Sequence, residues 1–77
     1  MQKEVFILTK AKSMQKEEFV DVFSSIKGLE KYLRKEVSQY IKKDSSLGNI
    51  ISYTDGRNDI NRANITFYFA HKKIVRD

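Results

Sequence analysis

The chain has 77 residues, of which 40% are hydrophobic and 32% are charged, and it has no cysteine. A chain of this length forms one domain, residues 1–77, and buries only about 60% of its unfolded surface, so it depends on good packing or on association. The composition is that of a folded chain, and no apolar run approaches the roughly 20 residues that cross a bilayer. The lack of cysteine excludes disulfides, thiolate nucleophiles, zinc–thiolate sites and iron–sulfur clusters.

The net charge of +5 and the isoelectric point near 9.6 favour an anionic partner, either nucleic acid or the acidic face of a protein. The same charge also serves solubility alone, which is the simpler interpretation. The first residues, MQKEVFILTK, lack the apolar stretch of a secretory leader. We therefore expect a cytoplasmic protein that does not bind membranes.

Two strands are predicted in the first third of the chain. Residues 3–9, KEVFILT, contain four consecutive apolar side chains, which is typical of a short strand buried on both faces. The following EEFVDVFSS alternates in a way that predicts a second strand. Phe19, Val22 and Phe23 also fit helical spacing, so a second helix in this place remains the alternative.

A helix is predicted over residues 26–43. Its apolar residues recur at spacings of three and four, and Ser24 or Ser25 can cap its start. The opposite side of this helix is basic, because four cationic residues fall within one narrow sector: Lys27, Lys31, Arg34 and Lys42. This basic face is a candidate site for nucleic-acid phosphates, and its simpler interpretation is a solvated helix surface.

Two further strands are predicted after the helix, IISYT at residues 50–54 and NITFYFA at residues 64–70, with a turn-rich connection between them. Neighbouring residues of a strand point to opposite faces. We expect Ile65, Phe67 and Phe69 to pack on the helix and Tyr68 to face away from it.

The predicted fold is a two-layer α+β domain of order ββαββ, with a mostly antiparallel sheet of about four strands and one helix on one face; βααββ is the alternative. The other face of the sheet then has no cover. Placing Asp21 on that face puts Val20 and Val22 under the helix, whereas the orientation of the first strand stays open. We expect the uncovered face to bind a second copy or another protein through four aromatic residues: Phe19, Phe23, Tyr53 and Tyr68.

The motifs VFILT, EEFVDVFSS and LEKYL, within residues 4–34, resemble a group of short uncharacterised proteins of bacteria and phages. In that group a Val-aromatic-x-Leu-Thr strand precedes a strand ending in VFSS and a helix of the Glu-x-Ala-x-x-Tyr-Leu type. This chain departs from the pattern at Lys27, Gly28 and Leu29. The resemblance implies the ββαββ order and a phage or mobile-element origin, and it implies no activity.

The sequence offers little catalytic chemistry. Its one histidine, His71, precedes two lysines and has no evident orienting partner for general-base catalysis. The loop DGRNDIN lacks the glycine and glutamate that an EF-hand calcium loop requires, and the glycines are too dispersed for a phosphate-binding loop. We expect no enzyme, no metal, no cofactor and no small-molecule substrate. The leading hypothesis is an interaction module, such as a phage-encoded modulator of a host protein, and the alternative is a sequence-nonspecific nucleic-acid-binding protein.

Overall fold

The computed structural model describes residues 2–12, 15–56 and 66–76. The predicted turn-rich connection, apart from its first residues Asp55 and Gly56, lies outside these residues, as does Ile65. Within the described part the elements follow in the order β1 (Gln2–Lys12), β2 (Glu18–Phe23), α1 (Ile26–Tyr32), η1 (Leu33–Val37), β3 (Ile41–Leu47), β4 (Ile50–Asp55) and β5 (Thr66–Arg76). The strands form one antiparallel five-stranded sheet of order β2-β1-β5-β4-β3.

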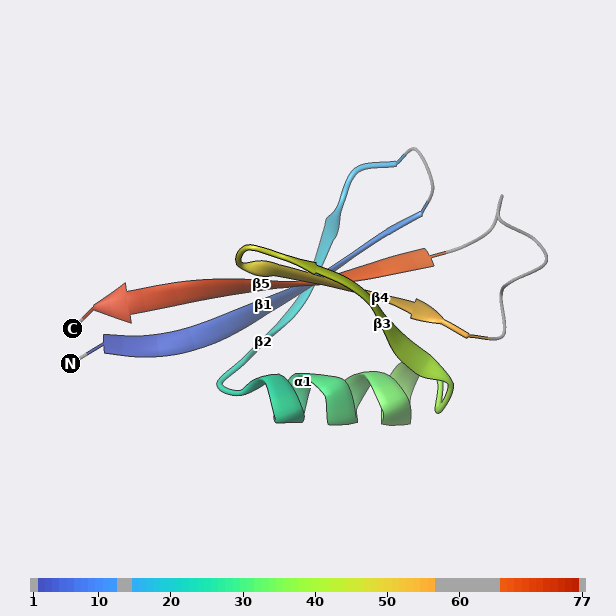
Figure 1. The fold of residues 1–77 in the computed structure, drawn as a ribbon, viewed down its shortest axis with the longest axis horizontal. Coiled ribbons are helices and arrows are strands. Elements are labelled where there is room, and N and C mark those ends of the chain that lie inside the picture. Colours follow the sequence, from blue (N-terminus) through green and yellow to red (C-terminus); the bar gives the residue numbers. More distant parts are fainter. Residues whose placement is uncertain (1, 13–14, 57–65, 77) are drawn as a thin grey trace.

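The sheet is strongly twisted, and the helical segment lies across one of its faces (Figure 1). The two-layer α+β class and the opening ββα order are confirmed, and the described residues contain one continuous helical segment, α1 followed by η1, as predicted. Residues 18–23 form a strand, so the alternative βααββ order is wrong. The prediction of about four strands missed β3, so the order of elements in the described residues is ββαβββ.

The helix ends six residues earlier than predicted. Its start is capped as expected, because the Ser25 side chain accepts a hydrogen bond from the backbone N–H of Gly28 at 3.0 Å. Its last turn widens into π-helical η1, where the N–H of Ser38 bonds to the carbonyl of Leu33. Ser38 is extended, and its hydroxyl accepts from the N–H of Tyr40, which turns the chain into β3. No helix in the described segments has the length and apolarity needed to span a membrane.

The core lies between the helix and the concave side of the sheet. Five of the described side chains are fully buried there: Leu8, Leu29, Leu33, Tyr53 and Ala70. The phenol of Tyr53 donates to the Glu30 carboxylate at 2.8 Å and so satisfies its buried polar atom. Burial, followed by this hydrogen bond, raises the pKa of Tyr53 well above its ordinary value.

The two longest strands, β1 and β5, pair over eleven residues each. Their partners on either side begin only at Phe6, opposite β2, and at His71, opposite β4. The ends of β1 and β5 therefore project from the sheet as a two-stranded ribbon that holds both chain termini (Figure 1). Ile74 and Val75 are exposed on opposite faces of this ribbon.

Candidate interaction surface

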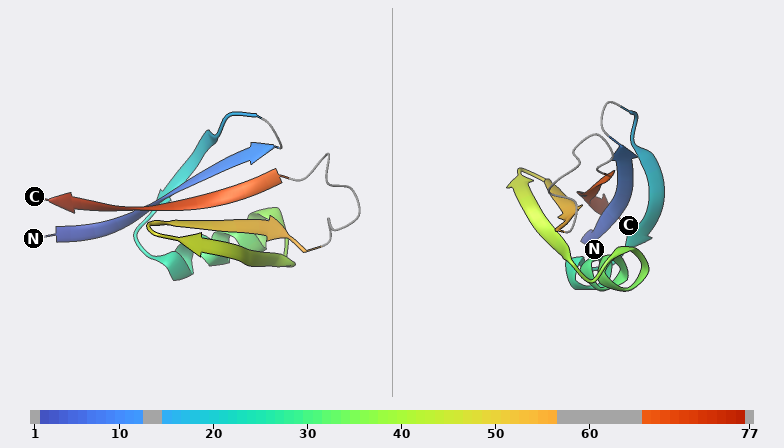
Figure 2. Two further views of the ribbon diagram at one scale, coloured as in Figure 1. Left: turned by 45° about the horizontal axis from the view of Figure 1, so that its top comes forward. Right: turned by 90° about the vertical axis from the view of Figure 1, so that its right-hand side faces the viewer.

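One sheet face packs on the helix, and within the described chain no helix covers the other (Figure 2). We call this other side the open face. Residues directly opposite each other in antiparallel strands share a face. The open face therefore consists of Thr9 and the residues that the strand pairings place on the same side of the sheet as Thr9. Its apolar residues are Val5, Ile7, Ala11, Phe19, Val22, Leu47, Ile50, Phe67, Phe69 and Val75.

Several of these side chains are strongly exposed. Leu47 is 82% exposed, Phe19 65%, Val22 47% and Ile50 42%, and these four come from three strands. In the middle of the face the rings of Phe67 and Phe69 stack at a centroid distance of 6.4 Å. Because an apolar surface spread over several strands is costly to leave in water, the open face is the strongest candidate for binding.

Only one of the four residues predicted for this face lies on it, namely Phe19. Phe23 packs on the helix side, where its ring lies 5.2 Å from that of Tyr32. Tyr53 is 1% exposed in the core, and Tyr68 packs against the same core. The predictions that Phe23, Tyr53 and Tyr68 face outward are therefore wrong.

A bulge in β2 explains the error at Phe23. Asp21 lies opposite Leu8 while Phe19 lies opposite the next residue, Thr9, so Val20 is an extra residue in β2. The bulge breaks the alternation that the sequence predicted. Val20 packs on the core as expected, whereas Val22, predicted to be buried, lies on the open face.

The orientation of β5 is the reverse of the predicted one. Tyr68 and Ala70 face the helix, and Phe67 and Phe69 lie on the open face. Ala70 is fully buried opposite Leu8 of β1, where a small side chain lets the helix pack closely. Sequence reasoning missed both phenylalanines as surface residues because phenylalanine is more often buried than tyrosine.

The open face also contains a hydrogen-bonded polar cluster. One carboxylate oxygen of Glu17 accepts from the Thr9 hydroxyl at 2.6 Å and lies 2.8 Å from Nε2 of His71. Oγ1 of Thr9 and Nε2 of His71 are 3.3 Å apart, and the His71 ring packs beside the Phe69 ring at a centroid distance of 6.3 Å. Both hydrogen bonds lower the pKa of Glu17, with that from Thr9 contributing most.

This cluster has the residue types of a catalytic triad without its connectivity. In a triad the histidine contacts the nucleophile through one ring nitrogen and the acid through the other. Here Nε2 of His71 makes both contacts, and the Thr9 hydroxyl donates its hydrogen bond to the Glu17 carboxylate. The arrangement holds Glu17 against the sheet and does not activate Thr9.

We expect Glu17 to make stability depend on acid pH. A carboxyl whose pKa is lowered by folding stabilises the protein above its unfolded pKa, near 4.5, and loses that effect as the pH falls through the lowered value. Urea unfolding of Glu17→Gln between pH 3 and pH 7 should lack this part of the pH dependence. Glu18→Gln is the matched control, since no hydrogen bond or ion pair of Glu18 with another described side chain is observed. Equal pH profiles for wild type and Glu17→Gln would contradict the assignment.

The predicted basic face of the helix is only partly assembled. Lys27, Lys31 and Arg34 lie exposed along α1 and η1. Lys42 belongs to β3 and not to the helix, so its place in this stripe is wrong. Arg34 also lies 3.7 Å from the Glu30 carboxylate, which reduces the positive charge on this side.

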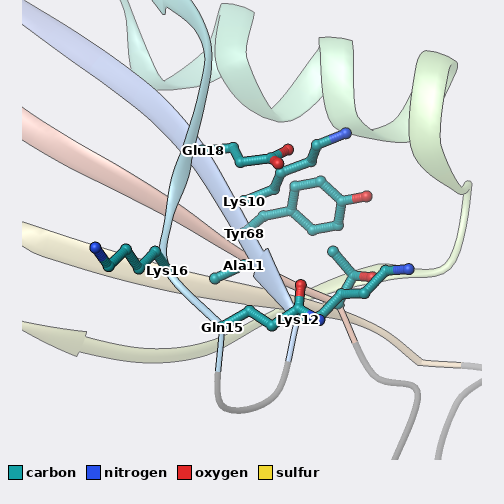
Figure 3. A pocket seen from close by; sticks show the side chains of 8 residues that line it. Lys10, Ala11, Lys12, Gln15, Lys16, Glu18 and Tyr68 are labelled. Carbon is teal, nitrogen blue, oxygen red and sulfur yellow. The ribbon is translucent and has the colours of Figure 1, made fainter.

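A separate basic recess lies near the β1–β2 connection (Figure 3). It has a volume of about 310 Å³ and includes Lys10, Lys12, Lys16 and Tyr68 among its lining residues. Lys10 and Lys12 extend to the same side as the Tyr68 ring, whereas Lys16 extends away from them (Figure 3). The lysine ammonium groups do not converge on one point, so the recess does not form a defined anion site.

No group of three or more histidine, cysteine, aspartate or glutamate side chains gathers as a metal site in the segments that the structure describes. Comparison of the chain with models of protein families, with curated proteins and with solved structures found no match.

Proposed function

We propose that the protein is a non-catalytic interaction module that self-associates through the open face. The observation that carries this proposal is the group of exposed apolar residues, with Phe19, Val22, Leu47 and Ile50 on one side of a sheet. Burial of such a surface stabilises association by roughly 25 cal/mol per Å² of apolar area, before the costs of ordering.

The edges of the sheet are less suited to association than its face. Edge strand β2 is bulged, and the Asp21 carboxylate accepts the backbone N–H of Val22 at 2.8 Å, so that donor is already used. Edge strand β3 has a second register shift between Lys43 and Ser45. Bulges and charged residues are devices that prevent edge-to-edge pairing of sheets. These features support face-to-face packing over strand addition.

A second copy of the chain is the occupant that the charge pattern supports. The chain carries +5 overall, whereas among the described residues the charged side chains assigned to the open face are the paired Glu17 and His71, Lys3 and Lys73 near the ribbon end, and Lys42 on edge strand β3. Two such faces can meet about a two-fold axis with few unpaired charges buried. The molecule is 45 Å long and 24 by 19 Å across, so a face along its length approaches the roughly 800 Å² per partner of a stable complex.

The resemblance to short bacterial and phage proteins extends this proposal to a biological role. A phage-encoded modulator of a host protein needs a binding surface and no catalytic site. Self-association then either presents the rest of the surface in two copies or protects the open face until a host protein displaces the second copy.

The test is the mass of the untagged protein in solution, measured by light scattering after gel filtration over a hundredfold range of loading concentration. We expect a species of twice the 9.1 kDa chain mass that dissociates only on dilution. A monomer at every concentration would contradict self-association.

A further inference from the structure

A second apolar site lies on the helix side of the sheet, away from the open face. It is a cavity of about 490 Å³ between the start of α1, the β3–β4 hairpin and the adjoining part of β1 and β5. This volume falls within the roughly 300 to 1,000 Å³ typical of small-molecule sites. The cavity exists because α1 begins only at Ile26 and leaves the tip of the hairpin, at Gly48 and Asn49, uncovered.

The cavity has an apolar floor. Phe6 of β1, Ile26 of α1 and Ile51 of β4 line it, and each packs against the buried core while remaining partly accessible. The hairpin is held against β5 by a backbone hydrogen bond of 2.8 Å from the N–H of Lys72 to the carbonyl of Asn49. The walls are therefore supplied by rigid elements, as pre-formed ligand sites require.

Cations surround this apolar floor. Lys27, Lys43 and Lys72 line the cavity from three different elements. Lys72 is 3.1 Å from Glu4, whereas no ion pair of Lys27 or Lys43 with another described residue is observed. The acidic residue of the lining, Glu30, is already engaged by the Tyr53 hydroxyl and by Arg34. The cavity thus has an excess of positive charge above an apolar base.

We propose that this cavity binds an amphipathic monocarboxylate, with the apolar chain on Phe6, Ile26 and Ile51 and the carboxylate between Lys27 and Lys43. Such a ligand satisfies both halves of the lining, because its chain leaves water while its anionic end stays near the lysine ammonium groups at the rim. A neutral apolar ligand would leave the charge unused. A compact anion such as phosphate would leave the floor exposed.

The test is a titration of the ¹⁵N-labelled protein with decanoate, kept below its micelle-forming concentration and followed by amide chemical shifts. We expect saturable shifts at Phe6, Ile26 and Ile51. Decanol should bind at least about fivefold more weakly and decyltrimethylammonium more weakly still, since each useful surface charge contact is worth up to about a factor of five.

Two variants locate the carboxylate. Lys27→Gln and Lys43→Gln should each weaken decanoate binding about fivefold, and Lys35→Gln, an exposed lysine of η1 outside the cavity, should leave it unchanged. Phe19→Glu, on the open face, should also leave it unchanged, which separates this site from self-association. Equal affinity for decanol and decanoate would overturn the proposal. It would equally be overturned by shifts confined to the open face, or by binding to anionic phospholipid vesicles without saturable decanoate binding.

Discussion

Leu29→Ala is expected to lower the free energy of unfolding by about 2–5 kcal/mol. Leu29 is fully buried and belongs to a core with only five fully buried apolar side chains among the described residues. Alanine is the best helix former, so the substitution removes packing without weakening the helix itself. A chain of 77 residues has roughly 4–12 kcal/mol of stability in total, so one such cavity removes a large share of it.

Urea unfolding followed by circular dichroism measures this effect, at one fixed protein concentration because self-association would contribute to stability. Lys31→Ala is the matched control, since Lys31 is exposed two residues further along the same helix. Its midpoint should move little. If Leu29→Ala cost less than about 1 kcal/mol, the helix would not be seated on the sheet as described.

The boundary between helix and β3 shows why the sequence predicted too long a helix. Ile41 is partly buried against the core, as the helical spacing required, but it reaches the core from a strand. A residue that must face inward fits both periodicities at the point where a helix turns into a strand. Ser38 determines where the helix ends, because its side chain accepts a hydrogen bond from the N–H of Tyr40 and so favours a turn. Local side-chain bonding of this kind leaves no periodic signal in the sequence.

The open face shows a second limit of sequence reasoning. The existence of an uncovered apolar sheet face follows from the element order, because one helix covers only one side of a sheet. Which residues lie on this face depends on which of the two alternating sets of side chains in each strand points away from the helix. The extra residue Val20 reverses the faces on which the following residues of β2 lie. The long-range pairing of Ala70 with Leu8 determines which residues of β5 face the helix. Phe19 precedes the bulge and lies on the open face as predicted, whereas Asp21 follows the bulge and lies opposite the core residue Leu8, so the prediction that Asp21 lies on the uncovered face is wrong.

The Glu17–His71 contact could not be predicted for a related reason. These residues are 54 positions apart in the chain, and β1, which carries Thr9, lies between the segments that hold them. From the sequence, His71 had no orienting partner. The antiparallel pairing of β1 with both β2 and β5 supplies one, on a mostly apolar face of the sheet.

Phe19→Glu is expected to abolish self-association while the fold is retained. Phe19 is 65% exposed, so a polar side chain there costs the monomer little. In a two-fold symmetric dimer the change buries one carboxylate from each copy, and burying an unpaired charge is strongly unfavourable. We expect the dissociation constant to rise by at least about 100-fold, which light scattering detects as a monomer at concentrations where the wild type is dimeric.

Ile74→Glu is the matched control because Ile74 is 55% exposed, is also apolar and lies on the opposite side of the sheet, on the ribbon of β1 and β5. Both variants add the same charge to an exposed strand position, so a general effect of net charge would change both equally. Circular dichroism should show unchanged helix content in each. Loss of the dimer in Ile74→Glu and its retention in Phe19→Glu would move the interface to the helix side of the ribbon, and dissociation of both would indicate that net charge, not the open face, controls association.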